Sequence, residues 1–137
     1  MLGDASLRLG AVYAKTDRSE KAAGAFKSGV DRLTGSEDER LLPTLIQLRS
    51  QYAQTQLKRE KWKSAAKHLE KVAEESKRAD DLPTRAWAFS ALARAQNKLG
   101  EHEAAKKSLE KGLPLAKKAG DEELVETIEA NLEAFAE

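Results

Sequence analysis

The chain has 137 residues, of which 34% are charged and only 5% aromatic, and its formal net charge is +1. It contains no cysteine, which excludes disulfide bonds and thiolate metal sites. No apolar run approaches the roughly twenty residues that a membrane span requires. The first ten residues lack the basic leader and apolar core of a signal peptide, so we expect a cytoplasmic location. The many Ala, Lys, Glu and Leu residues favour helices, and the periodic spacing of the apolar residues argues against disorder.

Two helices are predicted before residue 36. The first spans about residues 4–16, and the second, about residues 20–33, follows a plausible N-cap at Ser19. The second helix carries its apolar residues at three- and four-residue spacing: Ala22, Ala23, Phe26, Val30 and Leu33. Gly35 is expected where the chain turns through a positive φ. Ser36 and Glu39 fit a capping box at the start of the next helix.

The third and fourth helices are separated by a turn at Glu60 and Lys61. The third begins near Leu42, because Pro43 is comfortable only in a first turn, and it runs to about Arg59. The fourth covers about residues 62–78. Its predicted buried residues are Ala65, Ala66, Leu69, Val72 and Ala73.

The last three helices are bounded by aspartates and glycines. Asp80 or Asp81 caps the fifth helix, in which alanines add little bulk, so Phe89, Leu92 and Leu99 are expected to fill the core. The sixth helix covers about residues 101–119, and Pro114 is expected to remove one backbone hydrogen bond and bend it. Asp121 caps the seventh helix, residues 122–136. One face of that helix is apolar (Leu124, Val125, Ile128, Leu132 and Phe135), and glutamates stand opposite.

The sequence also matches itself at a shift of forty residues. Residues 42–44 fall on residues 82–84, Ala53 on Ala93 and Leu69 on Leu109. A shift of forty-three extends the match to the first helix pair, with Phe26 on Leu69. Self-similarity of this length is typical of stacked helical repeats.

These repeats resemble the tetratricopeptide repeat (TPR), which pairs a large and a small apolar residue in its first helix and spaces small and bulky residues in its second. The matching residues are Leu9, Gly10, Tyr13, Ala22, Phe26 and Gly29; then Tyr52, Ala53, Ala65, Leu69 and Val72; then Leu92, Ala93, Gly100, Ala105, Leu109 and Gly112. The forty-residue period resembles the long-helix variety. Arg49 departs from the pattern at a bulky apolar position, and Gln56 and Gln96 replace an expected aromatic residue.

The resemblance implies an all-α, right-handed α-solenoid in a single domain, residues 1–137. We expect three helix-turn-helix repeats at about 4–35, 40–79 and 81–119, closed by a capping helix at 121–136. Such a protein would be a non-catalytic scaffold that holds a peptide or a partner's helix in the concave groove formed by the first helices.

The repeat register predicts which residues line that groove. They are Trp87, Ser90, Arg94, Asn97 and Lys98; Gln47, Ser50, Gln51, Gln54 and Lys58; and Asp4, Leu7, Ala11 and Lys15. Lys15, Lys58 and Lys98 would form a basic row for an acidic or carboxylate-terminated ligand, with Trp87 as an aromatic anchor. The alternatives are solvated helix-end lysines and a Trp87 that only packs between helices.

Other binding chemistries find little support in the sequence. The clamp with which some TPR domains hold chaperone tails is replaced by Leu7, Ala11, Gln51, Trp87 and Ala91, so we do not expect that ligand. His68 and His102 are interpreted as surface residues of different repeats, without the spacing of a metal site. No phosphate loop, nucleophile motif or paired carboxylates occur, so we expect no enzyme activity, no cofactor and no metal. Nucleic-acid binding would need more basic residues and more aromatics among them.

The charge is unevenly distributed, which leaves other functions open. Residues 121–137 contain seven acidic side chains and no basic one. A dimer or filament could therefore form, either by an acidic seventh helix entering the basic groove of another copy or by uncovered repeat ends. The chain could instead be an excised or engineered piece of a longer repeat array.

Overall fold

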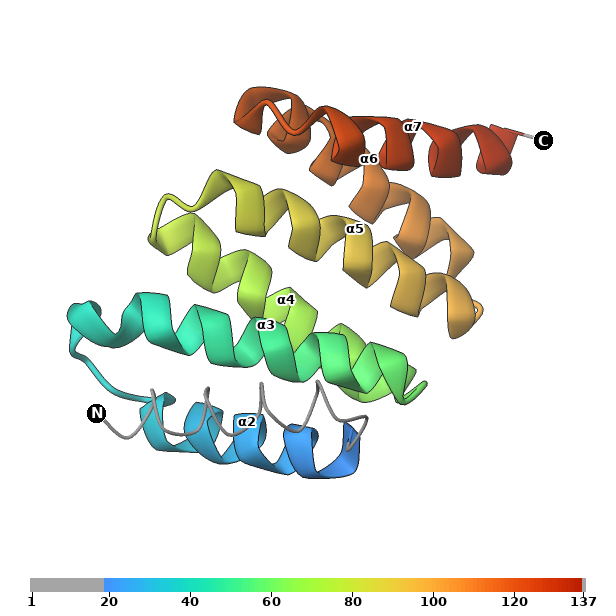
Figure 1. Ribbon diagram of the computed structural model, residues 1–137. Coiled ribbons are helices and arrows are strands. Elements are labelled where there is room, and N and C mark those ends of the chain that lie inside the picture. Colours follow the sequence, from blue (N-terminus) through green and yellow to red (C-terminus); the bar gives the residue numbers. More distant parts are fainter. Residues whose placement is uncertain (1–18, 137) are drawn as a thin grey trace. The chain divides into compact units, whose positions relative to one another are not determined.

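The computed structural model describes residues 19–136, so the predicted first helix lies outside the described residues. Six α-helices and one short 3-10 turn follow one another (Figure 1), and the described part contains no strand. The elements are α2 (Ser19–Leu33), η1 (Glu39–Leu41), α3 (Leu42–Lys58), α4 (Trp62–Arg78), α5 (Leu82–Lys98), α6 (His102–Ala119) and α7 (Glu122–Ala136). The predicted all-α fold of helical repeats is confirmed.

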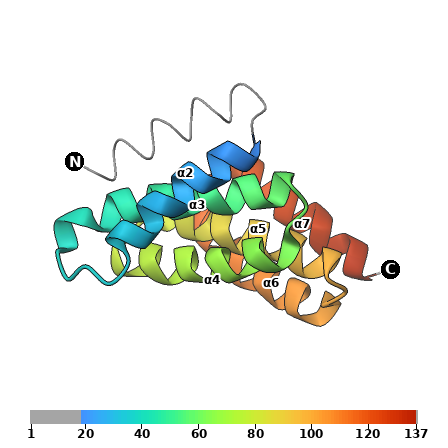
Figure 2. The ribbon, with the colours of Figure 1, turned by 90° about the horizontal axis from the view of Figure 1, so that it is seen from below.

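The described residues form two compact units, residues 19–68 and 69–136, with the boundary inside α4. In the first unit α2 packs against α3, and the two helices lie side by side in both views (Figures 1 and 2). The predicted apolar face of α2 forms this core together with Leu45, Leu48 and Tyr52 of α3. Phe26 and Leu48 are fully buried at its centre.

The second unit packs α6 against both α5 and α7. Its core combines small residues of α5 and α6 with larger ones: Ala86, Ala93, Ala105, Leu109, Ala116 and Ile128. Of the predicted face of α7, only Ile128 is fully buried, while Leu124, Val125, Leu132 and Phe135 are half-buried. A second cluster joins Val72 and Ala73 of α4 to Ala88, with Trp87 and Phe89 packed against it.

The predicted place of Leu99 in the core is wrong. Leu99 is the C-cap residue of α5 and is 39% exposed, because the helix ends before it can turn this side chain inward. Phe89 is half-buried and Leu92 is buried as predicted.

Four turns of one type connect helices α3 to α7. At each of them a residue with positive φ donates its N–H to the carbonyl three residues back, and the next residue donates to the carbonyl five residues back. These are the two bonds of a Schellman motif. The positive-φ residues are Glu60, Asp80, Gly100 and Gly120, which stand twenty positions apart. A helix pair therefore recurs every forty residues.

The helix starts follow the prediction at two aspartates and differ from it before α3. The Asp81 carboxylate accepts the N–H of Thr84, and that of Asp121 accepts the N–H of Leu124. The predicted capping box of Ser36 and Glu39 is wrong. The Ser36 hydroxyl accepts the N–H of Asp38 instead, because Asp38 is the residue that caps the 3-10 turn.

Pro114 lies inside α6, which continues without interruption from His102 to Ala119. Its exposed position lets the ring point away from the core.

Candidate functional site

Helix α3 exposes a single polar face. Gln47, Gln51, Gln54 and Lys58, with Pro43 at the start, are its exposed residues, and every other residue of the helix is buried or half-buried. Their spacing of three or four places them along one side of the helix. We call Gln47, Gln51, Gln54 and Lys58 the α3 stripe. Beside it, Ser50 is half-buried, and its hydroxyl oxygen has no hydrogen-bond partner in the described part.

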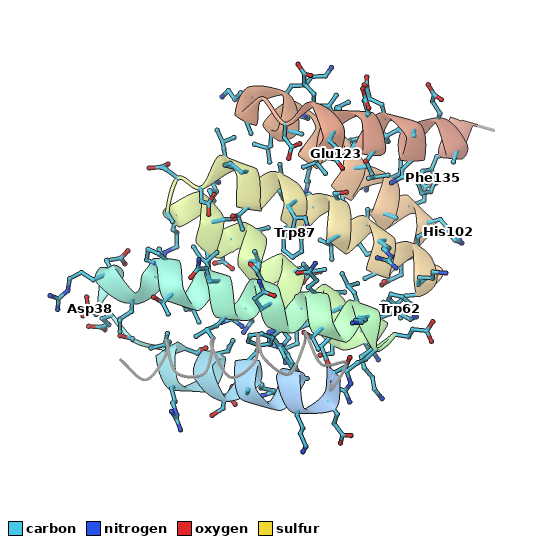
Figure 3. All side chains as sticks on the ribbon, in the orientation of Figure 1. Asp38, Trp62, Trp87, His102, Glu123 and Phe135 are labelled. Atoms are coloured by element: carbon cyan, nitrogen blue, oxygen red, sulfur yellow. The ribbon has the colours of Figure 1, made fainter. Side chains whose placement is uncertain are left out.

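The corresponding face of α5 carries an aromatic ring and positive charge. Arg94, Asn97 and Lys98 are exposed, whereas Trp87 and Ser90 are half-buried. Trp87, labelled in Figure 3, packs against the cluster of Val72, Ala73 and Ala88. Its indole is therefore supported by neighbours and remains partly accessible. We call Trp87, Ser90, Arg94, Asn97 and Lys98 the α5 stripe.

One residue of the α5 stripe has a partner on the next helix. The side-chain oxygen of Asn97 accepts a hydrogen bond from Nδ1 of His102, the first residue of α6. His102 is exposed, in agreement with its interpretation as a surface histidine. Asn97 thus helps to hold the α5–α6 turn.

Of the predicted basic row, Lys58 and Lys98 lie within the described residues. Each is the last residue of its helix. A cation in this position interacts favourably with the helix dipole, whatever else it binds. Asp4, Leu7, Ala11 and Lys15 lie outside the described residues.

A buried polar cluster beside α3 was not anticipated. Arg49 is only 2% exposed, and its guanidinium donates to Nδ1 of His68 at 3.1 Å and to the hydroxyl of Thr34 at 3.2 Å. The ring of Tyr52 meets that of His68 edge-on, with 4.7 Å between centroids. His68 is half-buried and tied to these two residues, so its interpretation as a surface histidine holds only in part. The one signal in the sequence was a charged residue, Arg49, at an apolar position of the repeat.

The described residues contain no group of His, Asp or Glu side chains that could hold a metal ion. Within this part of the chain no helix is both long and apolar enough to cross a membrane. Arg40 pairs with Asp38 at 3.0 Å and lowers the pKa of that carboxyl, but this exposed pair belongs to the 3-10 turn before α3.

Comparison with known proteins agrees with this architecture. The N-terminal domain of stress-induced protein-1 from C. elegans has the same fold at 22% identity, with a TM-score of 0.75 over 96% of this chain and 94% of that one. The C-terminal TPR-containing domain of a putative FK506-binding protein from Plasmodium falciparum is 21% identical, with a TM-score of 0.72 over 98% and 91%. No curated protein sequence matches the chain.

The family is shown by a sequence model. The model of the tetratricopeptide repeat matches residues 44–118, more than half of the chain. The TPR fold generally mediates protein–protein interaction, and its members are typically non-catalytic scaffolds. The chain belongs to the tetratricopeptide repeat family.

Proposed function

We propose that this protein is a non-catalytic scaffold that binds an acidic peptide, or an acidic helix of a partner, through the α5 stripe, and that the α3 stripe is a second, neutral binding face. The observation that carries the proposal is the exposure pattern of α3. A helix that is covered around most of its surface leaves one polar face uncovered, and the equivalent face of α5 holds a tryptophan and two cations.

The α5 stripe supplies the anchor and the charge. Trp87 is fixed by packing, so little side-chain entropy is lost when a ligand covers its remaining surface. Arg94 and Lys98 follow at seven and eleven residues, about 10 and 16 Å along the helix. A ligand with an apolar residue followed by carboxylates therefore fits this face, and the guanidinium of Arg94 can bind a carboxylate in a bidentate manner.

The α3 stripe supplies neutral hydrogen-bonding groups. Each of its three glutamines carries both a donor and an acceptor, which suits the peptide groups of a bound chain. Lys58 adds a cation at the end of the helix. This stripe would bind a peptide without selecting strongly among side chains.

The test is capture of peptides from a displayed random library by a Trp62→Phe variant, in which Trp87 is the single tryptophan. We expect captured peptides to be rich in Asp and Glu near an apolar residue, and to change the fluorescence of Trp87 on binding. Trp87→Ala combined with Arg94→Ala should abolish capture, with helicity unchanged by circular dichroism. The control exchanges two exposed lysines of α6, Lys106 and Lys117, for alanine. Equal capture by the Trp87/Arg94 variant would remove the α5 stripe as the site.

A further inference from the structure

Helix α7 presents four carboxylates along one exposed face. Glu122, Glu126, Glu129 and Glu133 are spaced by four, three and four residues, and all are exposed. We call them the glutamate stripe. Within the described residues none of the four forms an ion pair, and α7 has no basic side chain.

This arrangement is unfavourable for the isolated helix. Like charges four residues apart repel, and carboxylates near the C-terminal end, such as Glu133, oppose the helix dipole. A cationic partner beside the glutamate stripe would offset both unfavourable effects.

The same unit carries a matching stripe of the opposite charge on α6. Lys107, Lys111 and Lys118 are exposed, and with Pro114 they repeat the spacing of four, three and four. We call the three lysines the lysine stripe. None of them forms an ion pair in the part of the chain that the structure describes. Within α6, Glu103 and Glu110 stand four residues before and three residues after Lys107, on the same side of the helix as that lysine, whereas Lys111 and Lys118 have no acidic residue at such a spacing.

Both stripes run beside incompletely covered apolar side chains. Val125 and Leu132 stand three or four residues from Glu129, and Leu115 stands in the same relation to Lys111 and Lys118. All three apolar residues pack against the core of the second unit and are half-buried. A surface that sets such residues beside a row of charge has the composition of a small protein interface.

We propose that a second copy of this chain docks its lysine stripe on the glutamate stripe of α7. The two stripes have equal length and complementary charge, so parallel or antiparallel helices can bring several pairs into register. The contact uses residues of α6 and α7 and none of the α3 or α5 stripes, so it can be tested separately from the proposed peptide binding. Because exposed ion pairs are individually weak and screened by salt, the association is weak at physiological ionic strength and stronger at low salt.

The experiment is sedimentation velocity of the full chain over a range of concentrations at low and high salt. We expect a mass above that of the monomer at low salt, and an association constant that falls about tenfold or more at high salt. Reversing the lysine stripe (K107E/K111E/K118E) or three residues of the glutamate stripe (E126K/E129K/E133K) should each weaken association by about tenfold or more.

The decisive step is to mix the two reversed variants. Each associates poorly with itself, but the mixture pairs lysines on α7 of one with glutamates on α6 of the other and should regain association. A single chain that carries both reversals should also associate with itself. The matched control, K63E/K67E/K71E on α4, reverses three exposed lysines in a row and should associate about as well as the unchanged chain.

Several results would overturn the proposal. They are a monomer at every concentration and salt, undiminished association of a variant that carries only one of the two reversals, and a mixture that regains nothing although circular dichroism shows both variants folded. If a reversed variant fails to fold, the neutral variant E126Q/E129Q/E133Q replaces it, and association equal to that of the unchanged chain then refutes the contact.

Discussion

Helices α3 and α5 are the first helices of successive repeats, yet they carry different side chains at an equivalent position. Arg49 in α3 corresponds to Phe89 in α5, forty residues later, and His68 in α4 corresponds to Ser108 in α6. In the first unit the position holds a buried guanidinium with hydrogen bonds to His68 and Thr34. In the second it holds an aromatic ring packed on the cluster of Val72, Ala73 and Ala88.

A glycine of α6 lies close to Phe89. Gly112 corresponds to Val72 of the preceding repeat. A Cβ added at Gly112 would lie 3.2 Å from Cβ of Phe89 and 3.4 Å from Cδ1 of Ile128. The comparison shows that the repeat constrains the backbone and the total volume, while a buried position can be polar where its hydrogen bonds are satisfied.

The largest expected effect comes from removing the buried guanidinium of Arg49. Arg49→Ala leaves a cavity and takes the hydrogen-bond donors away from His68 and Thr34, so we expect the free energy of unfolding to fall by about 2–4 kcal/mol. Arg49→Met keeps most of the volume and should lose less than Arg49→Ala. Chemical denaturation measures both.

A double-mutant cycle tests whether His68 is the partner that matters. If it is, Arg49→Ala should cost less in a His68→Ala background, with a coupling of about 0.5–1.5 kcal/mol. Additive effects of the two substitutions would mean that the bond at 3.1 Å contributes nothing to stability.

The apolar packing around Phe89 should be destabilised by added volume at Gly112. Gly112→Val, which introduces the residue of the preceding repeat, should lower the free energy of unfolding by about 1–3 kcal/mol, because Phe89 and Ile128 must move. Gly112→Ala adds one methyl group and gains helix propensity, so we expect a change within about 1 kcal/mol of zero. Thermal unfolding of both variants checks the order. A Val variant as stable as the Ala variant would show that this packing is looser than the distances indicate.

The repeat and the helix bounds could be predicted from the sequence because they depend on local patterns. Helix α4 spans residues 62–78 and α7 spans 122–136 as expected, since periodic apolar residues and flanking turn residues define both. The buried face of α2 was predicted for the same reason. Pro43 marked the start of α3 correctly.

The features that could not be predicted depend on contacts between distant residues. Arg49 and His68 are nineteen residues apart, and nothing in either helix alone indicates that they meet. Ser36 and Asp38 compete for the same start of a helix, and only the path of the chain decides between them. For the candidate site, the register identified the exposed residues of α3, but exposure does not name a ligand.

The smallest expected effects come from the turns, where the repeats differ again. The same Schellman turn uses Glu60 and Asp80 in one pair and Gly100 and Gly120 in the other, all at positive φ. A non-glycine residue in this conformation costs about 1–2 kcal/mol, part of which is offset because glycine has more freedom in the unfolded chain. Glu60→Gly should therefore raise the free energy of unfolding by about 0.5–1 kcal/mol. Asp80→Gly should gain less, because aspartate tolerates the left-handed region better than glutamate does. Gly100→Ala and Gly120→Ala should each lower it by about 1 kcal/mol, although no side chain stands in the way of the added methyl group at either position. Equal stability of all four variants in thermal denaturation would show that the turns relax at no cost and that φ alone does not decide their residues.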